Sequence, residues 1–433
     1  MNTNEIQEVP DVSIPRTVAV ITNNTNCERH VQYYTTLEKY FMVNGWVIAN
    51  TFDVDMVVIS GCGFHNMMLE KVKVLLEDLN AANFQGELVM TGCIPTTHAA
   101  EWKKGFQGTL VELNGEAALD GLIHASVPFK ALQPANILKL HTDTITDAGK
   151  VLHVKVADGC MRQCSFCVIH KAKGRIRSLP PEELHKQIDA GVKAGYQTVF
   201  LMGEDTFAYG VDIETTIIDF VEAVLERHPG LQFQFGNLDH QWLVKYTDAI
   251  IALCQRGAIM QLHVGMQHIN DNLLVKMGRG GISSKTVYEA IVKLKQSCPQ
   301  LYLGVDIIVG FPGETDEIFA SLLEFFEKEE YIDNVQHNGY SAIAGAPAAE
   351  FEGQVPPSVI AARWYRLTRV LNQRTAFNRK DQSSNFDITF RETRDRAYTF
   401  IKDSVTDLPE SHGYAVDQPA ATNPGRRSLP IIS

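Results

Sequence analysis

Strand-like and helix-like segments alternate through most of this 433-residue chain, and this alternation limits the fold more than any other feature. Six strand-like runs lie in the later part of the chain, at 152–156, 198–202, 232–235, 260–264, 303–309 and 335–341. Helical patterns separate them, at 181–194, 213–227, 243–254, 284–296 and 316–329. Strands that alternate with helices form parallel sheets, so six such units predict a partial or full parallel barrel. Its chemistry is expected at the carboxyl ends of the strands.

The first 130 residues carry a shorter series of the same kind. Strand patterns at 17–21, 55–60 and 87–90 are followed by helical patterns at 31–43, 67–79 and near 98–104. The predicted fold class is therefore α/β, with an N-terminal parallel α/β domain, a (β/α)6 partial barrel and a short C-terminal extension. The expected divisions are a disordered lead-in at 1–15, the N-terminal domain at 16–130, a linker at 131–150, the barrel at 151–380 and an atypical C-terminal segment at 381–433. That last segment contains strand patterns only at 385–390 and 397–402.

The charge of the chain limits its partners. With 39 basic and 51 acidic residues, the net charge is −12, which argues against a general nucleic-acid or membrane-surface binder. No apolar run approaches the length of about 18 residues that spanning a membrane requires, and the N-terminus lacks the pattern of a secretion signal. The eight cysteines are then expected to be metal ligands or free thiols, and the compartment to be the cytoplasm.

Three of these cysteines form a tight cluster directly after the first barrel strand. Cys160, Cys164 and Cys167 are spaced so that one loop can wrap one face of a cubane iron–sulfur cluster. Three protein ligands leave one iron open to a substrate or cofactor. A zinc site is the main alternative, but it usually needs four ligands, and the fourth could be a residue such as His170. Three unrelated core cysteines within eight residues are the remaining interpretation.

A second set of cysteines follows the three strands predicted in the N-terminal domain. Cys27, Cys62 and Cys93 are far apart in sequence, but each comes just after a strand pattern. The carboxyl ends of parallel strands share one edge of a sheet, so the three thiols are expected to lie close together and to hold a second cluster. The alternative is that they are ordinary buried core residues.

The loop at 160–167 resembles the radical S-adenosylmethionine (SAM) signature, which is Cys-x3-Cys-x2-Cys with an aromatic residue, here Phe166, before the last cysteine. The resemblance implies that the open iron binds the amino and carboxylate groups of SAM. An electron donor such as flavodoxin or ferredoxin would reduce the cluster, and SAM would be cleaved to a radical that abstracts hydrogen from the substrate.

The wider sequence resembles the radical SAM methylthiotransferase family. The shared motifs include Gly61-Cys62-Gly63, Thr91-Gly92-Cys93, the run 203–210, the run 264–268, Lys276-Met277-Gly278-Arg279 and the run 306–315. The resemblance implies two [4Fe-4S] clusters, with an auxiliary cluster in the N-terminal domain. The run 205–210 is nearer to the branch that modifies a ribosomal protein than to the tRNA branch. The chain departs from the family at 25–28, at 264–270 and after Asp381, where too few residues remain for an RNA-binding β-barrel.

Several residues beyond the cysteines are candidates for holding SAM. Each candidate follows or ends a barrel strand, and each has an ordinary structural explanation as well: Glu204, Gln267, Arg279, Asp306, Gly310 and Gly313. A carboxylate such as Glu204 can accept hydrogen bonds from the SAM amino group, and Arg279 can pair with its carboxylate. The glycines allow a close approach of the backbone, or simply form a strand-to-helix turn.

The leading hypothesis is a methylthiotransferase that inserts sulfur and a methyl group at an unactivated C–H bond. Because the chain is acidic and its C-terminal segment is short, a small molecule or peptide is the preferred substrate. The alternatives are methylthiolation of a ribosomal protein or a tRNA, radical chemistry without sulfur insertion, and an iron–sulfur sensor without enzymatic activity.

Overall fold

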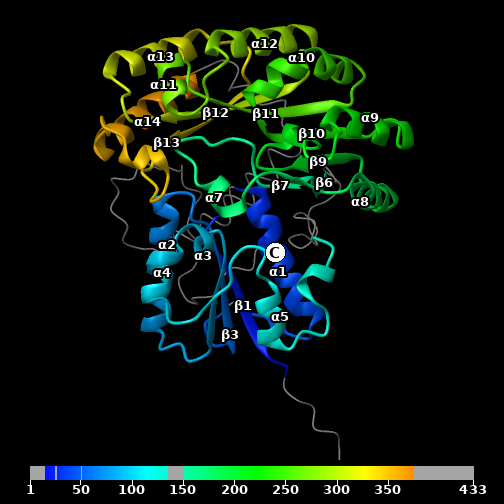
Figure 1. Ribbon diagram of the computed structural model, residues 1–433, viewed down its shortest axis with the longest axis vertical. Helices are drawn as coiled ribbons and strands as arrows, with labels where there is room; N and C mark the ends of the chain where they lie inside the picture. Colours follow the sequence, from blue (N-terminus) through cyan, green and yellow to red (C-terminus); the bar gives the residue numbers. More distant parts are fainter. Residues whose placement is uncertain (1–14, 25–26, 50, 135–150, 374–433) are drawn as a thin grey trace, which may run out of the picture.

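A computed structural model describes residues 15–24, 27–49, 51–134 and 151–373. Two parallel sheets, each covered by helices, lie one above the other in Figure 1. The lower lobe, blue to cyan, is formed by the N-terminal residues. The upper lobe, green to orange, is formed by the residues from 151 onward.

The sheet of the lower lobe has five parallel strands in the order β2-β1-β3-β4-β5. Their bounds are β1 Thr17–Thr22, β2 Val47–Ile48, β3 Met56–Gly61, β4 Glu87–Gly92 and β5 Thr109–Leu110. The helices of this lobe are α1 Glu28–Val43, α2 Asn66–Ala81, α3 Ile94–Thr97, α4 Ala99–Gly105 and α5 Ala117–Ile123. All six residues of β3 are buried, because this central strand has one apolar cluster on each face. A strand covered on both sides has a continuous apolar run rather than an alternating pattern.

The sheet of the upper lobe has six parallel strands, and its spatial order follows the chain. Their bounds are β6 Val151–Lys155, β9 Thr198–Met202, β10 Gln232–Asp239, β11 Ile259–Gln267, β12 Tyr302–Val309 and β13 Asn334–Gly339. A short antiparallel pair, β7 Ala157–Asp158 and β8 Arg177–Ser178, flanks the sheet. Within the described residues β6 and β13 are not paired with each other, so the sheet forms the open, partial barrel that the sequence predicts.

Helices cover the outer face of this barrel (Figure 1). They are α8 Pro181–Lys193, α9 Ile217–Arg227, α10 His240–Gln255, α11 Asp271–Lys276, α12 Ser284–Ser297, α13 Asp316–Lys328 and α14 Pro357–Gln373. The short helix α7 Ile169–Lys173 lies instead between the two lobes, next to α3. Alternate strand residues, among them Leu201, Phe233 and Leu262, pack in one large core with the helices. The intervening positions face the other way and include polar side chains such as Gln234 and His263, as the two-residue period of a strand requires.

The two lobes contact each other where the start of α1, which follows β1, packs against the barrel strands β6 and β9. Val31 of α1 packs with Val151, Phe200 and Met202 of the barrel. The side chain of Gln32 also donates a hydrogen bond of 3.1 Å to the carbonyl oxygen of His153. The first turn of α1 therefore lies against the barrel, and the strand ends of both sheets face a common region.

The predicted elements agree with the structure in kind, and their ends differ for local reasons. Helix α9 begins at Ile217 rather than near 213, because the Thr216 side chain accepts the N–H of Asp219 and caps it there. Strand β10 continues beyond 235, and β11 beyond 264, through irregular pairing in which Asn237 and Gln267 have positive φ. The strand patterns at 385–390 and 397–402 lie outside the described residues.

None of the helices in the described residues is long and apolar enough to cross a membrane.

Candidate active site

The thiols of Cys27, Cys62 and Cys93 lie along the carboxyl edge of the lower sheet. Cys27 is the residue before α1, while Cys62 and Cys93 directly follow β3 and β4. Burial raises the pKa of Cys62 to about 12, and the nearby sulfurs of Cys93 and Cys27 add to that shift. Residues separated by more than 60 positions are thus close enough to interact electrostatically.

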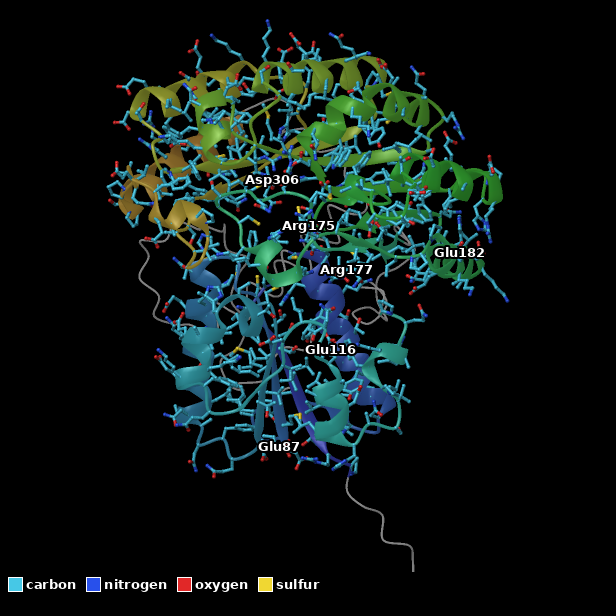
Figure 2. All side chains as sticks on the ribbon, in the orientation of Figure 1. Glu87, Glu116, Arg175, Arg177, Glu182 and Asp306 are labelled. Carbon is cyan, nitrogen blue, oxygen red and sulfur yellow. The ribbon has the colours of Figure 1, made fainter. Side chains whose placement is uncertain are left out.

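Figure 2 shows how the strand direction produces this arrangement. Glu87, the first residue of β4, lies at the far end of the lower lobe. Arg175 and Asp306 of the barrel lie where the two lobes meet. Strand β4 runs from Glu87 toward the place where the lobes meet. Cys93, which directly follows β4, therefore lies at the end of the sheet that faces the barrel.

The local sequence around Cys62 is explained by close packing. A side chain at Gly61 would bring a Cβ within 2.8 Å of the Ile94 side chain, and one at Gly63 within 2.6 Å of the Thr97 hydroxyl. The Gly-Cys-Gly motif is therefore needed for α3 to pack over the thiol-bearing edge. The Asn23 side chain fixes the Cys62 peptide, since it accepts the N–H of Cys62 at 2.7 Å and donates to its carbonyl oxygen at 3.0 Å.

The second set of thiols lies in the loop between β7 and α7. Each sulfur has an N–H donor nearby: the Arg162 backbone for Cys160 at 3.4 Å, the Ile169 backbone for Cys167 at 3.4 Å and the Arg279 side chain for Cys164 at 3.5 Å. Burial raises the pKa of both Cys160 and Cys167 to about 12, and the neighbouring sulfur of Cys164 contributes to each shift. An electropositive metal centre would reverse that shift, because a coordinating thiol is deprotonated.

The donor set fits an iron–sulfur cluster better than a single ion. In the part of the chain that the structure describes, no three His, Cys, Asp or Glu side chains are arranged around one ion position. In a cubane cluster the cysteine ligands bind different iron atoms, so more widely spaced thiols are suitable.

A buried group of charged side chains adjoins Cys164. Asp239 pairs with Arg279 at 2.9 Å and with Arg162 at 2.9 Å, and Arg279 also lies 2.8 Å from the ring nitrogen of His240. Burial, together with the adjacent Asp239, raises the pKa of Asp205 to about 7. Arg279 is only 4% exposed and is therefore engaged by the protein itself rather than held ready at a surface.

A carboxylate with three donors lies between the two sets of thiols. Lys173 approaches Oε1 of Glu204 at 2.6 Å, and the Gly159 N–H donates to Oε2 at 3.1 Å. The Nε of Arg29 is 2.9 Å from Oε1, an ion-pair distance at which its N–H is not aligned as a hydrogen bond. Burial would raise the pKa of Glu204, but Arg29 and Lys173 outweigh it and hold that pKa below its usual value.

The other predicted SAM residues lie on neighbouring strands of the same barrel. Asp306 of β12 pairs with His263 of β11 at 3.1 Å. Gln267 ends β11 with a φ of 66°, a left-handed conformation that is costly for a residue with a side chain. Strained residues of this kind are often found at functional sites, and Asn237 of β10 also has a positive φ, of 54°.

The two predicted glycines have a packing role in the structure. A Cβ at Gly310 would lie 2.4 Å from Ile360 of α14, and one at Gly313 would lie 2.7 Å from the amino group of Lys276. Both glycines also have positive φ. Their missing side chains thus make room for the protein itself, and their contact with SAM stays a prediction.

Sequence reasoning missed the charged partners in the lobe interface. Charged side chains are common on protein surfaces, so the sequence alone does not distinguish a buried charged residue from an exposed one. No motif in the sequence marks Arg29, Lys173 or Asp239 as buried. Only the fold shows that they are buried beside the thiols. The position of Arg29, two residues after Cys27, was the one available indication.

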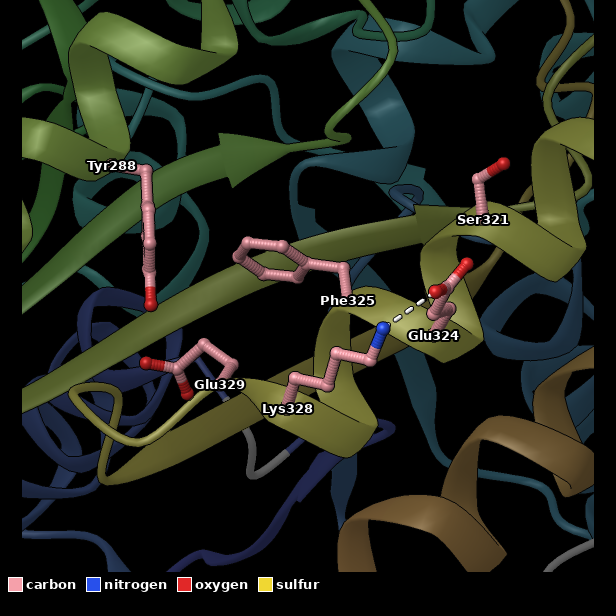
Figure 3. A pocket seen from close by; sticks show the side chains of 6 residues that line it. All are labelled: Tyr288, Ser321, Glu324, Phe325, Lys328 and Glu329. Carbon is pink, nitrogen blue, oxygen red and sulfur yellow. Dashed lines mark hydrogen bonds and ion pairs between the residues drawn. The ribbon is translucent and has the colours of Figure 1, made fainter.

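A hollow of about 350 Å3 lies away from this region, between α12 and α13 (Figure 3). Its lining residues are Tyr288, Ser321, Glu324, Phe325, Lys328 and Glu329. Lys328 pairs with Glu324 at 2.6 Å on the exposed helix surface. The hollow contains none of the cysteines and is not part of the candidate active site.

Comparison with known proteins identifies the class. Residues 154–326 match the model of the radical SAM superfamily. The structure of the radical SAM methyltransferase TsrM from Kitasatospora setae, with tryptophan and a SAM analogue bound, is similar with a TM-score of 0.51 at 11% sequence identity. That similarity covers 77% of this chain and 75% of the other, and it supports the fold alone. The fold, the cysteine loop and the superfamily match together define a radical SAM enzyme.

Relatives in sequence narrow the class further. The ribosomal protein uS12 methylthiotransferase RimO of Acidithiobacillus ferrooxidans is 30% identical over 345 residues, which cover 74% of this chain and 73% of the relative. The RimO protein of Burkholderia lata is 28% identical over 410 residues, with 87% of each chain covered. The chain belongs to the radical SAM methylthiotransferase family. It is an enzyme that transfers methylthio groups, with SAM and [4Fe-4S] chemistry as its cofactor requirement.

The expectation of a small-molecule or peptide substrate is wrong. The relatives that cover most of the chain are named for a ribosomal protein, uS12, and not for a small molecule or a peptide. The reasoning failed because a net charge of −12 argues against nucleic acid but equally favours a basic protein partner.

Proposed function

We propose that this enzyme methylthiolates a ribosomal protein in the cytoplasm, with one [4Fe-4S] cluster on Cys160, Cys164 and Cys167 and another on Cys27, Cys62 and Cys93. The observation that carries the proposal is the pair of cysteine sets at facing sheet edges, in a chain whose relatives are uS12 methylthiotransferases. A net charge of −12 is consistent with that partner, since proteins that bind RNA phosphates are basic.

The residues of the chain have separable roles in this proposal. The backbone N–H groups of Arg162 and Ile169 and the side chain of Arg279 favour the thiolate forms of the barrel cysteines. Asp239 holds Arg279 in place through an ion pair that is almost wholly buried. When bound, SAM and the clusters supply the hydrogen abstraction and the sulfur and methyl groups.

The SAM contacts remain part of the proposal. Gln267 and Asp306 lie on the adjacent strands β11 and β12, and Arg279 adjoins Cys164. We assign these three side chains to the SAM side of the site. The strained backbone of Gln267 supports its assignment, because such strain is retained where the geometry is needed.

The experiment is an anaerobic assay with the full chain, reconstituted with iron and sulfide. It is supplied with SAM, a flavodoxin reducing system and purified uS12 or the small ribosomal subunit. Intact-mass and peptide mass spectrometry should show one sulfur and one methyl group added in place of a hydrogen. The variant Cys62→Ala should cleave SAM but leave the protein substrate unmodified. The buried but unclustered Cys254→Ala is the matched control and should retain the transfer.

Other outcomes distinguish the alternatives. A different mass change on the same protein would favour radical chemistry without sulfur insertion. Transfer that persists in Cys62→Ala would refute a role for the N-terminal thiols. If the reduced chain fails to cleave SAM at all, the enzymatic proposal fails and a sensor becomes the better explanation.

A further inference from the structure

The carboxylate of Glu204 connects the two loops that carry the proposed cluster ligands. Its side chain is 1% exposed. On the barrel side it accepts the N–H of Gly159, the residue before Cys160, at 3.1 Å. On the side of the lower lobe it pairs with Arg29, which lies two residues after Cys27. One carboxylate thus bridges the lobes at the thiols.

The two cations on this carboxylate also act on the N-terminal thiols. The Arg29 guanidinium lies 3.9 Å from the sulfur of Cys27 and donates a short hydrogen bond to the carbonyl oxygen of Gly203. Burial raises the pKa of Cys93, and the nearby charge of Lys173 opposes that rise. The side chains of Arg29 and Lys173 are only 12% and 18% exposed. Screening by solvent and salt is therefore weak, and the charges act at nearly full strength.

We propose that Arg29, Lys173 and Glu204 form an ionic triad of positioning residues that fixes the spacing of the two cluster sites and sets the electrostatic field at the N-terminal one. Arg29 and Lys173 stabilise added negative charge at that site, and Glu204 offsets part of their effect. The inference rests on the proposed cluster at Cys27, Cys62 and Cys93.

This role differs from the one expected for Glu204 as an acceptor for the SAM amino group. This carboxylate already accepts hydrogen bonds from Lys173 and from the Gly159 N–H, and the Arg29 cation lies 2.9 Å from the same oxygen as Lys173. Its partners come from the lower lobe and from the β7–α7 region rather than from an open cavity. The geometry favours a link between sites over a ligand contact.

The charges of the triad predict the direction in which each substitution shifts the reduction potential of the N-terminal cluster. Reduction adds an electron to a cluster, so a nearby positive charge makes reduction easier and a nearby negative charge makes it harder. Arg29→Gln should therefore lower the reduction potential of the N-terminal cluster. Glu204→Gln, which removes the opposing charge in nearly the same volume, should raise it. Arg29→Lys keeps the charge and should leave the potential near that of the parent.

The test uses the full chain with Cys160, Cys164 and Cys167 replaced by alanine, so that any cluster present is the N-terminal one. Iron content and an electron paramagnetic resonance redox titration are measured in the parent and in each variant. The matched control is Lys295→Gln, which breaks a mostly buried ion pair with Asp333 far from the thiols and should not shift the potential.

Shifts of opposite direction for Arg29→Gln and Glu204→Gln would support the triad, because mere loosening of the interface would move both variants the same way. Shifts in the same direction, or none, overturn it while leaving the two-cluster proposal intact. A Glu204→Gln variant of the otherwise wild-type chain that loses SAM binding, with an unchanged N-terminal potential, would assign the carboxylate to SAM instead. Absence of iron from the parent would overturn both the triad and the second cluster.

Discussion

The substitution Arg363→Leu should destabilise the barrel strongly, because it leaves a buried carboxylate without its main partner. The Glu314 side chain is fully buried. Its Oε1 accepts a hydrogen bond from the Arg363 guanidinium at 2.8 Å and one from the Gly310 N–H at 3.0 Å. Its Oε2 lies 3.2 Å from the ring nitrogen of His268. Arg363 also pairs with Asp316, but that carboxylate is 88% exposed and adds little.

The magnitude follows from the cost of an unpaired buried charge. Removal of one partner of a buried ion pair costs about 3–5 kcal/mol, and the remaining Gly310 N–H keeps the value for Arg363→Leu near the lower end of that range. For a domain of this size about 3 kcal/mol lowers the melting temperature by roughly 6–12 °C. The assay is thermal and urea unfolding of the purified chain, followed by circular dichroism.

A double variant separates the charge effect from lost packing. Glu314→Leu combined with Arg363→Leu removes the uncompensated carboxylate along with its partner, and it should be more stable than Arg363→Leu alone. If the single variant unfolds within about 1 kcal/mol of the wild type, or if the double variant is the less stable of the two, the reasoning about the buried pair is refuted.

Three further predictions concern the site. Gly310→Ala should lower the melting temperature, because its φ is 78° and the new Cβ would lie 2.4 Å from Ile360; adding Ile360→Ala should restore only the part due to that clash. The pKa of Asp205 is about 7 in the folded protein, so the folded state binds the proton of this residue more tightly than the unfolded chain does. The free energy of unfolding should therefore fall by up to roughly 4 kcal/mol as Asp205 loses that proton between about pH 4 and pH 8. Asp205→Asn should flatten that decline in urea titrations, and an unchanged slope would contradict the assignment. Asn23→Ala should lower the free energy of unfolding by about 1–3 kcal/mol, because Asn23 hydrogen-bonds both the N–H and the carbonyl oxygen of Cys62. The variant should also bind less iron, and full iron occupancy would contradict this role of Asn23.

The repeated local patterns were predictable from the sequence. The six barrel strands and the glycines beside Cys62 and Cys93 are encoded within a few residues, by apolar runs and by the need for close approach. The strand ends were less predictable, because β10 and β11 continue through the irregular positions Asn237 and Gln267, which an apolar pattern does not reveal.

Contacts between distant segments could not be predicted in the same way. The SAM contact of Glu204 stays a prediction, while its charged partners in the structure come from α1, 175 positions earlier, and from α7. Nothing in the sequence near Glu204 indicates either of them. The choice of substrate was wrong for a different reason: the net charge of −12 indicates the sign of the charge on a partner but not whether that partner is a small molecule, a peptide or a protein.

The ion pair that crosses between the lobes limits how the enzyme can open. Swinging the lower lobe away like a hinge would separate Arg29 from Glu204 and would also remove Val31 from its contact with Phe200 and Met202. Any opening of this kind would break contacts right beside the thiols, so it would also change the spacing of the two cysteine sets.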